Sequence, residues 1–444
     1  MTLPESFIKE LNTVLGDDTE KYISLFSQPP YRGISVNRLK TTPDRVKSLL
    51  PLELTSCPFY KDGFYIPTET QGIGNSPLHH AGAFYVQEPS AMSAVTLLSP
   101  ERGDRVLDLC AAPGGKSVQI ASTLGGAGLL WSNEIVKSRA QILLSNFERA
   151  GIRNGVISSL HPDTLCTRLE GFFDKVLVDA PCSGEGMFRK DERALTEWSR
   201  EHVRACAARQ LSVLESGARA LRRGGILVYS TCTFSYEENE GVINEFLKRN
   251  SDFEGVDISE PFGRKTELSC GIRITPVEGG EGHFGARLRK KGDSDCRNSF
   301  ESRRKSTGEQ ARLSENLLEE IFKKRPDGEL KMIGDKVYLL PEKMPDISDI
   351  SIIRAGLLMG ELKKNRIEPC HSLFTSFRPE MFNSVLDLSL DDERIAEYLS
   401  GSEIDAEGKS GYTAVAFCGI TAGFGKCSGG RLKNKYPKGL RVRC

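Results

Sequence analysis

The 444-residue sequence lacks several features that would assign a protein class at once. It has no net charge at pH 7, because 60 Lys and Arg residues balance 60 Asp and Glu residues. No stretch approaches the roughly 18 apolar residues of a membrane helix, and the N-terminus shows neither the basic flank nor the apolar run of a signal peptide. We therefore predict a cytoplasmic protein with no membrane partner, in which any polyanion-binding surface comes from local basic clusters.

Cysteine is not scarce, but the patterns that usually explain it are missing. The twelve cysteines include no C-x-x-C pair and no Cys/His spacing typical of a zinc module. A chain of this length buries a core of its own and does not need a disulfide framework. We predict reduced thiols and no metal site.

Two nucleotide-binding signatures are absent from the glycine-rich stretch Asp108–Ser117. A Walker loop needs a glycine where the sequence has Cys110, and the G-x-G-x-x-G fingerprint is missing. An adenosine ligand without phosphates, such as S-adenosylmethionine, therefore fits this loop better than ATP or NAD. We expect Glu134, at the end of the second strand, to hold the ribose hydroxyls. Asp163, after the third strand, is expected to accept from the adenine amino group.

From Val86 onward the sequence alternates regularly between apolar strands and amphipathic helices. Strand-like runs occur at 105–109, 156–158, 176–178 and 225–228, with one more ending at Glu134. This spacing is typical of a parallel, doubly wound sheet, so we predict an α/β, Rossmann-like domain.

The chain is too long for a single core, and shifts in composition divide it into four parts. The predicted boundaries are 1–84 for a small N-terminal region, 85–292 for the sheet domain, 293–310 for a basic linker and 311–444 for a C-terminal α+β region. Residues 60–85 are rich in turn residues and are expected to form a small lid or connector.

Local basic clusters are candidates for an RNA-binding surface. Tyr31–Lys40 is typical of a strand with basic residues on one face, and a solvated edge strand is an equal alternative. The segment 287–305 carries eight Lys and Arg against three acids, and the last 24 residues carry seven basic residues and no acid. The tail favours phosphate binding over a solvated face, whereas for Arg189 and Lys190 the two interpretations are equal.

Two of the predicted strands end in cysteines. The apolar run before Asp179 leads into Pro181-Cys182, and the run from Gly225 leads into Thr231-Cys232. Because ligands bind at the carboxyl ends of parallel strands, both thiols are predicted to lie beside the cofactor loop. The helix after Cys232 is expected to begin with a capping box, Ser235-x-x-Glu238.

A thiolate in this position can activate an electron-poor ring. Its addition to carbon 6 of cytosine turns carbon 5 into a nucleophile for a methyl group, after which the carbon 5 proton and the thiolate must leave. A second cysteine or another base has a role in that last step. Asp179 is expected to hydrogen-bond the exocyclic amine and ring nitrogen of cytosine. These residues alone do not decide which cysteine attacks, and a redox dithiol is a rival that lacks the usual C-x-x-C spacing.

Similarity to a known family is carried by five stretches, YVQEPSAM, VLDLCAAPGGKS, VDAPCSGEGMFRKD, YSTCTFSYEENE and RITPVEGGEGHFGARL. They resemble the RNA cytosine-C5 methyltransferase family (the Nol1/Nop2/Sun group) in its bacterial RsmF/YebU-type 16S rRNA branch. GELKKNRIEPCHS and GRLKNKYPKGLR resemble the C-terminal extension of that branch.

The resemblance implies that Cys232 is the covalent nucleophile and that Cys182 assists product release. It implies contacts to S-adenosylmethionine from Glu134, Asp163 and Asp179. Seven loop residues are implied in the same contacts, namely Cys110, Ala111, Ala112, Pro113, Gly114, Gly115 and Lys116. It further implies an N-terminal region that aids RNA binding and a PUA-like RNA-binding domain in the C-terminal region.

The expected function is therefore the methylation of carbon 5 of a cytidine in ribosomal RNA, as a step of rRNA processing. We expect S-adenosylmethionine as cofactor, 16S RNA as partner and a monomeric enzyme. Two alternatives stay open: the same chemistry on tRNA, and a non-catalytic RNA-binding ribosome assembly factor. The paired cysteines and the complete cofactor loop speak against the second alternative.

Overall fold

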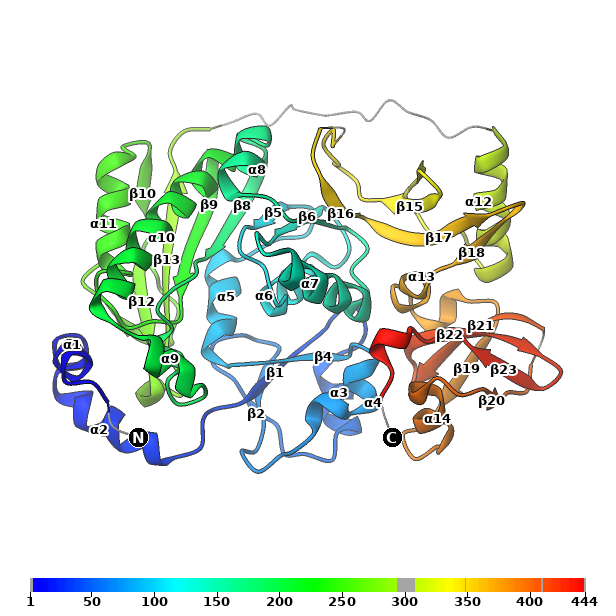
Figure 1. The fold of residues 1–444 in the computed structure, drawn as a ribbon, viewed down its shortest axis with the longest axis horizontal. Helices are drawn as coiled ribbons and strands as arrows, with labels where there is room; N and C mark the ends of the chain where they lie inside the picture. The colour runs from blue at the N-terminus through cyan, green and yellow to red at the C-terminus, as the bar shows by residue number, and fades with distance from the viewer. Residues whose placement is uncertain (1–2, 294–307, 348, 409, 443–444) are drawn as a thin grey trace.

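A computed structural model describes residues 3–293, 308–347, 349–408 and 410–442. A large central sheet is flanked by an N-terminal region and by two smaller C-terminal sheets (Figure 1). Within the described ranges, none of the helices has the length and apolar character needed to cross a bilayer.

The central sheet contains five parallel strands. They are β5 (Arg105–Asp108), β6 (Leu129–Asn133), β7 (Gly155–Ser158), β8 (Phe173–Asp179) and β9 (Leu221–Thr231). Antiparallel strands at the edges are β10 (Phe253–Gly255), β11 (Arg264–Lys265), β12 (Gly271–Ile274), β13 (His283–Lys290) and β16 (Ile352–Ala355). The order is β11-β12-β13-β9-β8-β5-β6-β7-β16, with β10 paired to β13.

Helices cover both faces of this sheet, because its strands are apolar on both sides. In β8, Val176 and Val178 belong to one hydrophobic cluster while Leu177 belongs to the other. One face is covered by α5 (Ser93–Leu98), α6 (Gly115–Leu124) and α7 (Lys137–Ala150). The other is covered by α8 (Pro162–Arg168), α10 (Arg200–Ala220) and α11 (Glu240–Arg249). The predicted doubly wound, Rossmann-like α/β fold is confirmed.

The N-terminal region combines helices with a small antiparallel sheet of order β2-β3-β1-β4. The strands are β1 (Gly33–Val36), β2 (Thr55–Ser56), β3 (Gly63–Tyr65) and β4 (Phe84–Gln87). The helices are α1 (Glu5–Leu15), α2 (Thr19–Ser24), α3 (Pro43–Leu49) and α4 (Pro77–His80). The stretch expected to be a lid or connector therefore supplies two strands and a helix.

The basic strand expected at 31–40 is neither an edge strand nor an open RNA surface. β1 lies between β3 and β4, and all four of its residues are buried. Arg38 forms an ion pair with Asp62, and the buried Lys40 donates to the backbone oxygens of Thr375 and Thr421. The positive charges of Arg38 and Lys40 therefore bind groups within the protein.

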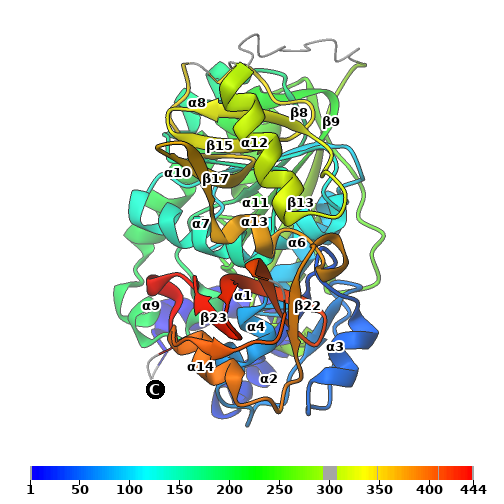
Figure 2. The same ribbon diagram turned by 90° about the vertical axis from the view of Figure 1, so that its right-hand side faces the viewer.

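The C-terminal region contains two sheets, stacked one above the other in Figure 2 with α13 (His371–Thr375) between them. The first consists of β14 (Glu329–Ile333), β15 (Lys336–Leu340), β17 (Leu357–Lys363) and β18 (Arg366–Pro369), preceded by α12 (Gly308–Ile321). The second consists of β19 (Val385–Leu388), β20 (Ile404–Asp405), β21 (Gly411–Phe417), β22 (Ile420–Ser428) and β23 (Arg431–Asn434), with α14 (Arg394–Ser400).

The boundaries between these parts differ from the predicted ones. Strand β16, from the C-terminal region, pairs with β7, so the central sheet extends beyond the predicted range 85–292. The basic segment 287–305 begins inside β13, and 294–307 lies outside the described residues. The second C-terminal sheet shares a hydrophobic cluster with the N-terminal region, to which Ile34 and Phe84 contribute on one side and Ile395 and Phe417 on the other.

Asn37 connects the N-terminal region to helix α7. Its side chain is 1% exposed, and its Nδ2 donates to the backbone oxygens of Gly82 at 2.9 Å and Ala150 at 2.8 Å. We expect Asn37→Ala to lower the free energy of unfolding by about 1–3 kcal/mol, because two buried carbonyls lose their donor. Urea unfolding measures this, with the exposed Asn75→Ala as control. Equal midpoints for the two variants would contradict the role of Asn37.

Candidate functional site

The two cysteine loops meet at the carboxyl edge of the central sheet. β8 and β9 are parallel neighbours in a register that places Asp179 opposite Ser230. The loops that leave these strands bring the sulfur atoms of Cys182 and Cys232 to 3.2 Å from each other. The ten cysteines in the described residues are all free thiols, as expected from the sequence.

The two thiols are not equivalent. Burial and the hydrogen bond with Cys232 hold the pKa of Cys182 well above its ordinary range, with the Cys232 hydrogen bond as the largest cause. The backbone N–H of Cys232 also donates to the Cys182 sulfur, at 3.4 Å. In the free protein Cys182 is therefore a thiol, able to donate its proton to the Cys232 sulfur.

Buried carboxylates hold the two loops together. Glu238 accepts from the backbone N–H of Ser183 at 3.0 Å and from Nε2 of Gln210 at 2.6 Å. Glu185 accepts from the indole N–H of Trp198 at 2.8 Å and from the backbone N–H of Phe234 at 2.9 Å. Each carboxylate thus joins groups from separate segments.

The role of Glu238 corrects an expectation. Its backbone N–H donates to the Ser235 hydroxyl oxygen at 3.4 Å, as in a capping box, but its carboxylate accepts from the cysteine loop instead of the N-cap backbone. Helix α11 begins only at Glu240 and has no side-chain cap at Asn239. The sequence pattern alone does not distinguish a glutamate that caps a helix from one whose carboxylate binds the backbone of a neighbouring loop.

Asp179 lies between the cysteines and the glycine-rich loop. Lys116 Nζ lies 2.8 Å from its Oδ2, and the Ser230 hydroxyl donates to its Oδ1 at 2.8 Å. Burial alone would raise the pKa of Asp179, but Lys116, His283 and Ser230 outweigh it and hold that pKa below the ordinary value. The pKa of Lys116 is raised, because Asp179 outweighs the effect of burial. The pair therefore stays ionised.

A cavity of about 310 Å³ opens beside this ion pair. Six of the seven predicted loop residues line it, together with Asp108, Asp179 and Met187. Its opposite wall comes from β4 and the residues after it, Tyr85, Val86, Gln87, Glu88 and Ala91. Sequence reasoning missed this wall, although YVQEPSAM is among the motifs that carried the family resemblance.

The glycine-rich loop follows the contour of this cavity closely. Gly114, the one predicted loop residue that does not line it, has φ +119°, in the left-handed region that favours glycine. A Cβ on Gly115 would lie 2.4 Å from Oε1 of Gln87. Asp108 has an Oδ1 that is buried and lacks a hydrogen-bond partner among the described residues, and burial raises its pKa to about 7.

The other two predicted acids lie in different surroundings. Glu134 directly follows β6 and is 3% exposed; its Oε1 accepts from the backbone N–H of Val136 at 2.9 Å, and Arg139 lies 3.4 Å from Oε2. Glu134 is not among the residues that line the cavity, and neither is Asp163. Asp163 is in the first turn of α8, where its exposed carboxylate accepts from Arg219 of α10 at 2.6 Å. The contact of Asp163 with adenine stays a prediction.

A second cavity, of about 390 Å³, adjoins the first and shares the Val86–Glu88 wall. Arg32, Arg189 and Lys190 line it. Arg189 makes its contacts inside the protein. It pairs with Glu281 and donates to two backbone oxygens, and its side chain is 3% exposed. Lys190 is exposed at the rim of the cavity. Of the two basic residues after the turn, only Lys190 remains a candidate phosphate contact.

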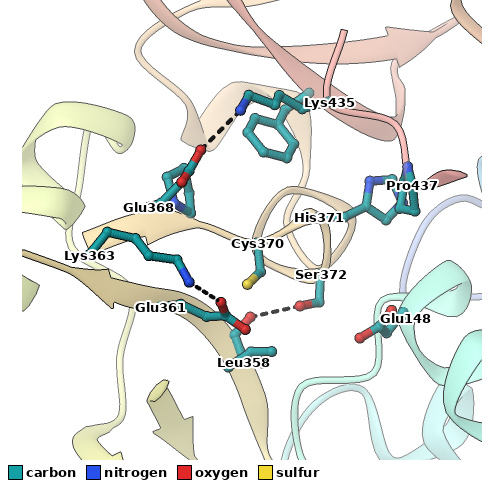
Figure 3. Close-up of a pocket in the computed structure, with 12 residues that line it drawn as sticks. Glu148, Leu358, Glu361, Lys363, Glu368, Cys370, His371, Ser372, Lys435 and Pro437 are labelled. Carbon is teal, nitrogen blue, oxygen red and sulfur yellow. Dashed lines mark hydrogen bonds and ion pairs between the residues drawn. The ribbon is translucent and has the colours of Figure 1, made fainter. Parts of the chain in front are cut away.

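A third cavity, of about 370 Å³, lies between the C-terminal sheets and α7 (Figure 3). Its charges are paired, with Lys435 on Glu368 and Lys363 on Glu361, each at 2.9 Å. Nothing in its lining selects one class of ligand. Across the described residues, no cluster of His, Cys, Asp and Glu is suited to holding a metal ion.

Comparison with known proteins places this site in a family. A model described as 16S rRNA methyltransferase RsmB/F matches residues 95–289, and one for the N-terminal domain of 16S rRNA methyltransferase RsmF matches 3–89. The first C-terminal domain of RsmF rRNA methyltransferase matches 316–377, and the methyltransferase RsmF PUA domain matches 385–442.

Solved structures support the fold. A methyltransferase homolog protein from Pyrococcus horikoshii is 28% identical, covers 65% of this chain and all of its own, and has a TM-score of 0.56. NSun6 from Pyrococcus horikoshii, solved with the S-adenosylmethionine analogue SFG, is 22% identical with a TM-score of 0.59 and covers 65% of this chain and 99% of its own.

Curated relatives match over nearly the full length. Ribosomal RNA small subunit methyltransferase F of Vibrio vulnificus is 32% identical over 99% of this chain and 97% of the relative. The same coverage and identity hold for the protein of that name from Aeromonas salmonicida. The chain therefore belongs to the RsmF branch of the 16S rRNA methyltransferase RsmB/F family.

Proposed function

We propose that this protein methylates carbon 5 of a cytidine in the RNA of the small ribosomal subunit, through a covalent adduct between Cys232 and carbon 6. The observation that carries the proposal is the pair of sulfur atoms 3.2 Å apart beside the Lys116–Asp179 ion pair. The relatives named small subunit methyltransferase F support the choice of ribosomal RNA over tRNA. A non-catalytic assembly factor would have no use for this arrangement.

The cofactor is S-adenosylmethionine, which supplies an electrophilic methyl group. The cavity of about 310 Å³ offers one group that suits it, since the unpartnered Oδ1 of Asp108 is a buried acceptor for an amino group. Glu134 and the 54%-exposed Ile135 follow β6 and do not line this cavity. They are proposed to bind the ribose hydroxyls and the adenine ring where the cofactor extends beyond it. Because S-adenosylmethionine carries no phosphate, the glycine-rich loop does not need to bind a phosphate chain.

Asp179 and Lys116 are proposed to hold the target base. An ionised carboxylate accepts from the exocyclic amine of cytosine. It also accepts from the ring nitrogen once thiolate addition has made that nitrogen basic and it has taken up a proton from solvent. Uracil presents a carbonyl oxygen in place of the amine and would face the carboxylate with a second acceptor. Asp179 therefore both selects cytosine and stabilises the adduct.

The two thiols act in sequence. The Cys232 thiolate adds to carbon 6, carbon 5 becomes the nucleophile, and after methylation a base removes the carbon 5 proton while the bond between carbon 6 and sulfur breaks. The hydrogen bond and charge of Cys232 are among the causes that keep Cys182 protonated. Adduct formation consumes that sulfur and removes both causes. Burial and the charge of Glu238 still raise the pKa of Cys182, and once its proton has passed to solvent the thiolate can serve as the base for product release.

RNA binding is proposed to involve the parts outside the central sheet. The second C-terminal sheet (β19 to β23), here called the PUA-like sheet because the PUA-domain model covers it, carries the exposed Lys433. The exposed Lys438 follows it in the 3-10 turn Lys438–Leu440, and Lys190 lies at the rim of the cavity next to the cofactor cavity. We propose 1–84 and 311–444 as RNA-binding regions around the 85–292 catalytic domain, acting in a monomeric cytoplasmic enzyme.

The roles of the cysteines predict opposite phenotypes. Cys232→Ala should abolish methylation, because no adduct forms. Cys182→Ser should accumulate a covalent protein–RNA complex, visible on a denaturing gel as a slow, ribonuclease-sensitive band. Cys418→Ser, in the turn between β21 and β22, is the control. An adduct with Cys232→Ser and none with Cys182→Ser would reverse the assignment.

The substrate is tested by bisulfite mapping after methylation of rRNA and tRNA in vitro. We expect a protected cytidine in 16S rRNA, either in naked RNA or in the assembled subunit, and none in tRNA. Modification of tRNA alone would favour the alternative substrate.

The close approach at Gly115 predicts a steric effect on cofactor binding. In Gly115→Ala the new Cβ would clash with the side chains of Gln87 and Tyr85, which line the cavity and must shift, so we expect affinity for S-adenosylmethionine to fall roughly tenfold. Isothermal titration measures this, with Gly74→Ala, where a Cβ meets open space, as the matched control. Unchanged affinity in the Gly115 variant would place the cofactor elsewhere.

The basic residues of the PUA-like sheet predict a salt effect. Replacing Lys433 and Lys438 by Ala should weaken RNA binding and reduce the slope of log affinity against log salt by about one to two. Lys248→Ala, on the exposed face of α11, is the control. A slope that does not change would remove this sheet from the binding surface.

A further inference from the structure

His283 is the one buried histidine next to the candidate active site in the described structure. It opens β13, is 2% exposed, and neither of its ring nitrogens has a hydrogen-bond partner among the described residues. Unpartnered polar groups at such depth are rare in folded proteins, because burial removes them from water without compensation. A phenylalanine of similar size would fill the same space without this cost.

The position of His283 is tightly determined. Its neighbour Phe284 pairs with Thr231, the last residue of β9. The preceding Gly282 has φ +150°, and a Cβ there would lie 2.6 Å from the ring of Phe234 and 2.8 Å from Cα of Gly186. The chain therefore enters β13 pressed against the two cysteine loops.

The ring of His283 lies close to Asp179 without lining the cofactor cavity. Nε2 lies 3.9 Å from Oδ1 of Asp179, while His283 is not among the residues that line the cavity. Burial, reinforced by the charge of Lys116, lowers the pKa of His283 to about 4. At neutral pH it is an uncharged imidazole with one donor and one acceptor nitrogen.

We propose that His283 is a positioning residue for Asp179, whose Nε2–H closes on Oδ1 when the target base binds. With Ser230 on the same oxygen and Lys116 on Oδ2, this donor completes a set that fixes the plane of the carboxylate and keeps it ionised. Distances between catalytic groups are often long before the substrate arrives, which accounts for the present 3.9 Å. A direct contact of His283 with the base is disfavoured because both nitrogens are buried. The inference rests on the proposed role of Asp179.

The charged and polar groups that face Asp179 come from four strands and helices. They are Lys116 from α6, Ser230 from β9, His283 from β13 and Asp108 from β5. Loss of a donor to a carboxylate favours its protonated form and raises its pKa. The proposed mechanism needs Asp179 ionised. The acid limb of the pH–rate profile, where activity falls as Asp179 is protonated, would therefore move to higher pH.

Variants of His283 in the full-length protein test this inference. In His283→Gln the amide reaches the place of Nε2 and keeps the donor, in His283→Asn it is too short, and His283→Phe keeps the volume without a donor. The single-turnover rate on unmodified small-subunit RNA is measured from about pH 3 to pH 9, because the pKa of Asp179 is held below its ordinary value and its acid limb therefore lies below about pH 4. Melting temperature and affinity for S-adenosylmethionine are measured in parallel.

We expect the Asn and Phe variants to lose roughly tenfold or more in rate and to show an acid limb at higher pH, with the Gln variant close to wild type. A purely structural role would lower the melting temperature without moving the acid limb. Wild-type rates in the Phe variant, or equal losses with an unshifted limb in the Gln and Asn variants, would overturn the inference. Absence of cytosine methylation by the wild-type protein would instead overturn the proposed function.

Discussion

The parallel pairing of β8 with β9 is the constraint on which the active centre depends. Its register places Asp179 opposite Ser230, so that the loops carrying Cys182 and Cys232 leave the sheet side by side. A strand pair packed on both faces resists a slip by one residue, because the slip would move every side chain to the opposite face and disrupt the close packing of both hydrophobic clusters. The sulfur pair is therefore held by the packing of the sheet as well as by the buried carboxylates of the loops.

The charges around the two thiols keep each group in the protonation state that the proposed mechanism needs. Lys116 and Asp179 sustain each other as an ion pair despite burial, while Cys182 is kept protonated by Cys232. The neutral His283 adds a donor without adding a competing charge next to Lys116. Inside the protein, where the dielectric constant is low, these neighbouring charges and hydrogen bonds shift the pKa values of the site strongly.

The accessory regions are integrated with the catalytic sheet. β16 extends the sheet beside β7, and one hydrophobic cluster is shared by the N-terminal region and the PUA-like sheet. Several basic residues are used internally for this purpose, among them Arg38 on Asp62 and Lys40 on two C-terminal carbonyls. Fewer basic residues are therefore available for the proposed RNA surface than a count of basic residues indicates.

The sequence by itself determined the fold and most of the site. Apolar strand runs followed by short polar motifs define a doubly wound sheet, and they place Asp179, Cys182 and Cys232 at one rim, because side-chain pattern and strand direction are local properties. Tertiary structure alone decided the contacts between distant segments. It paired Asp163 with Arg219 and brought His283 from an antiparallel strand to within 3.9 Å of Asp179, because such contacts depend on packing geometry that no local pattern encodes.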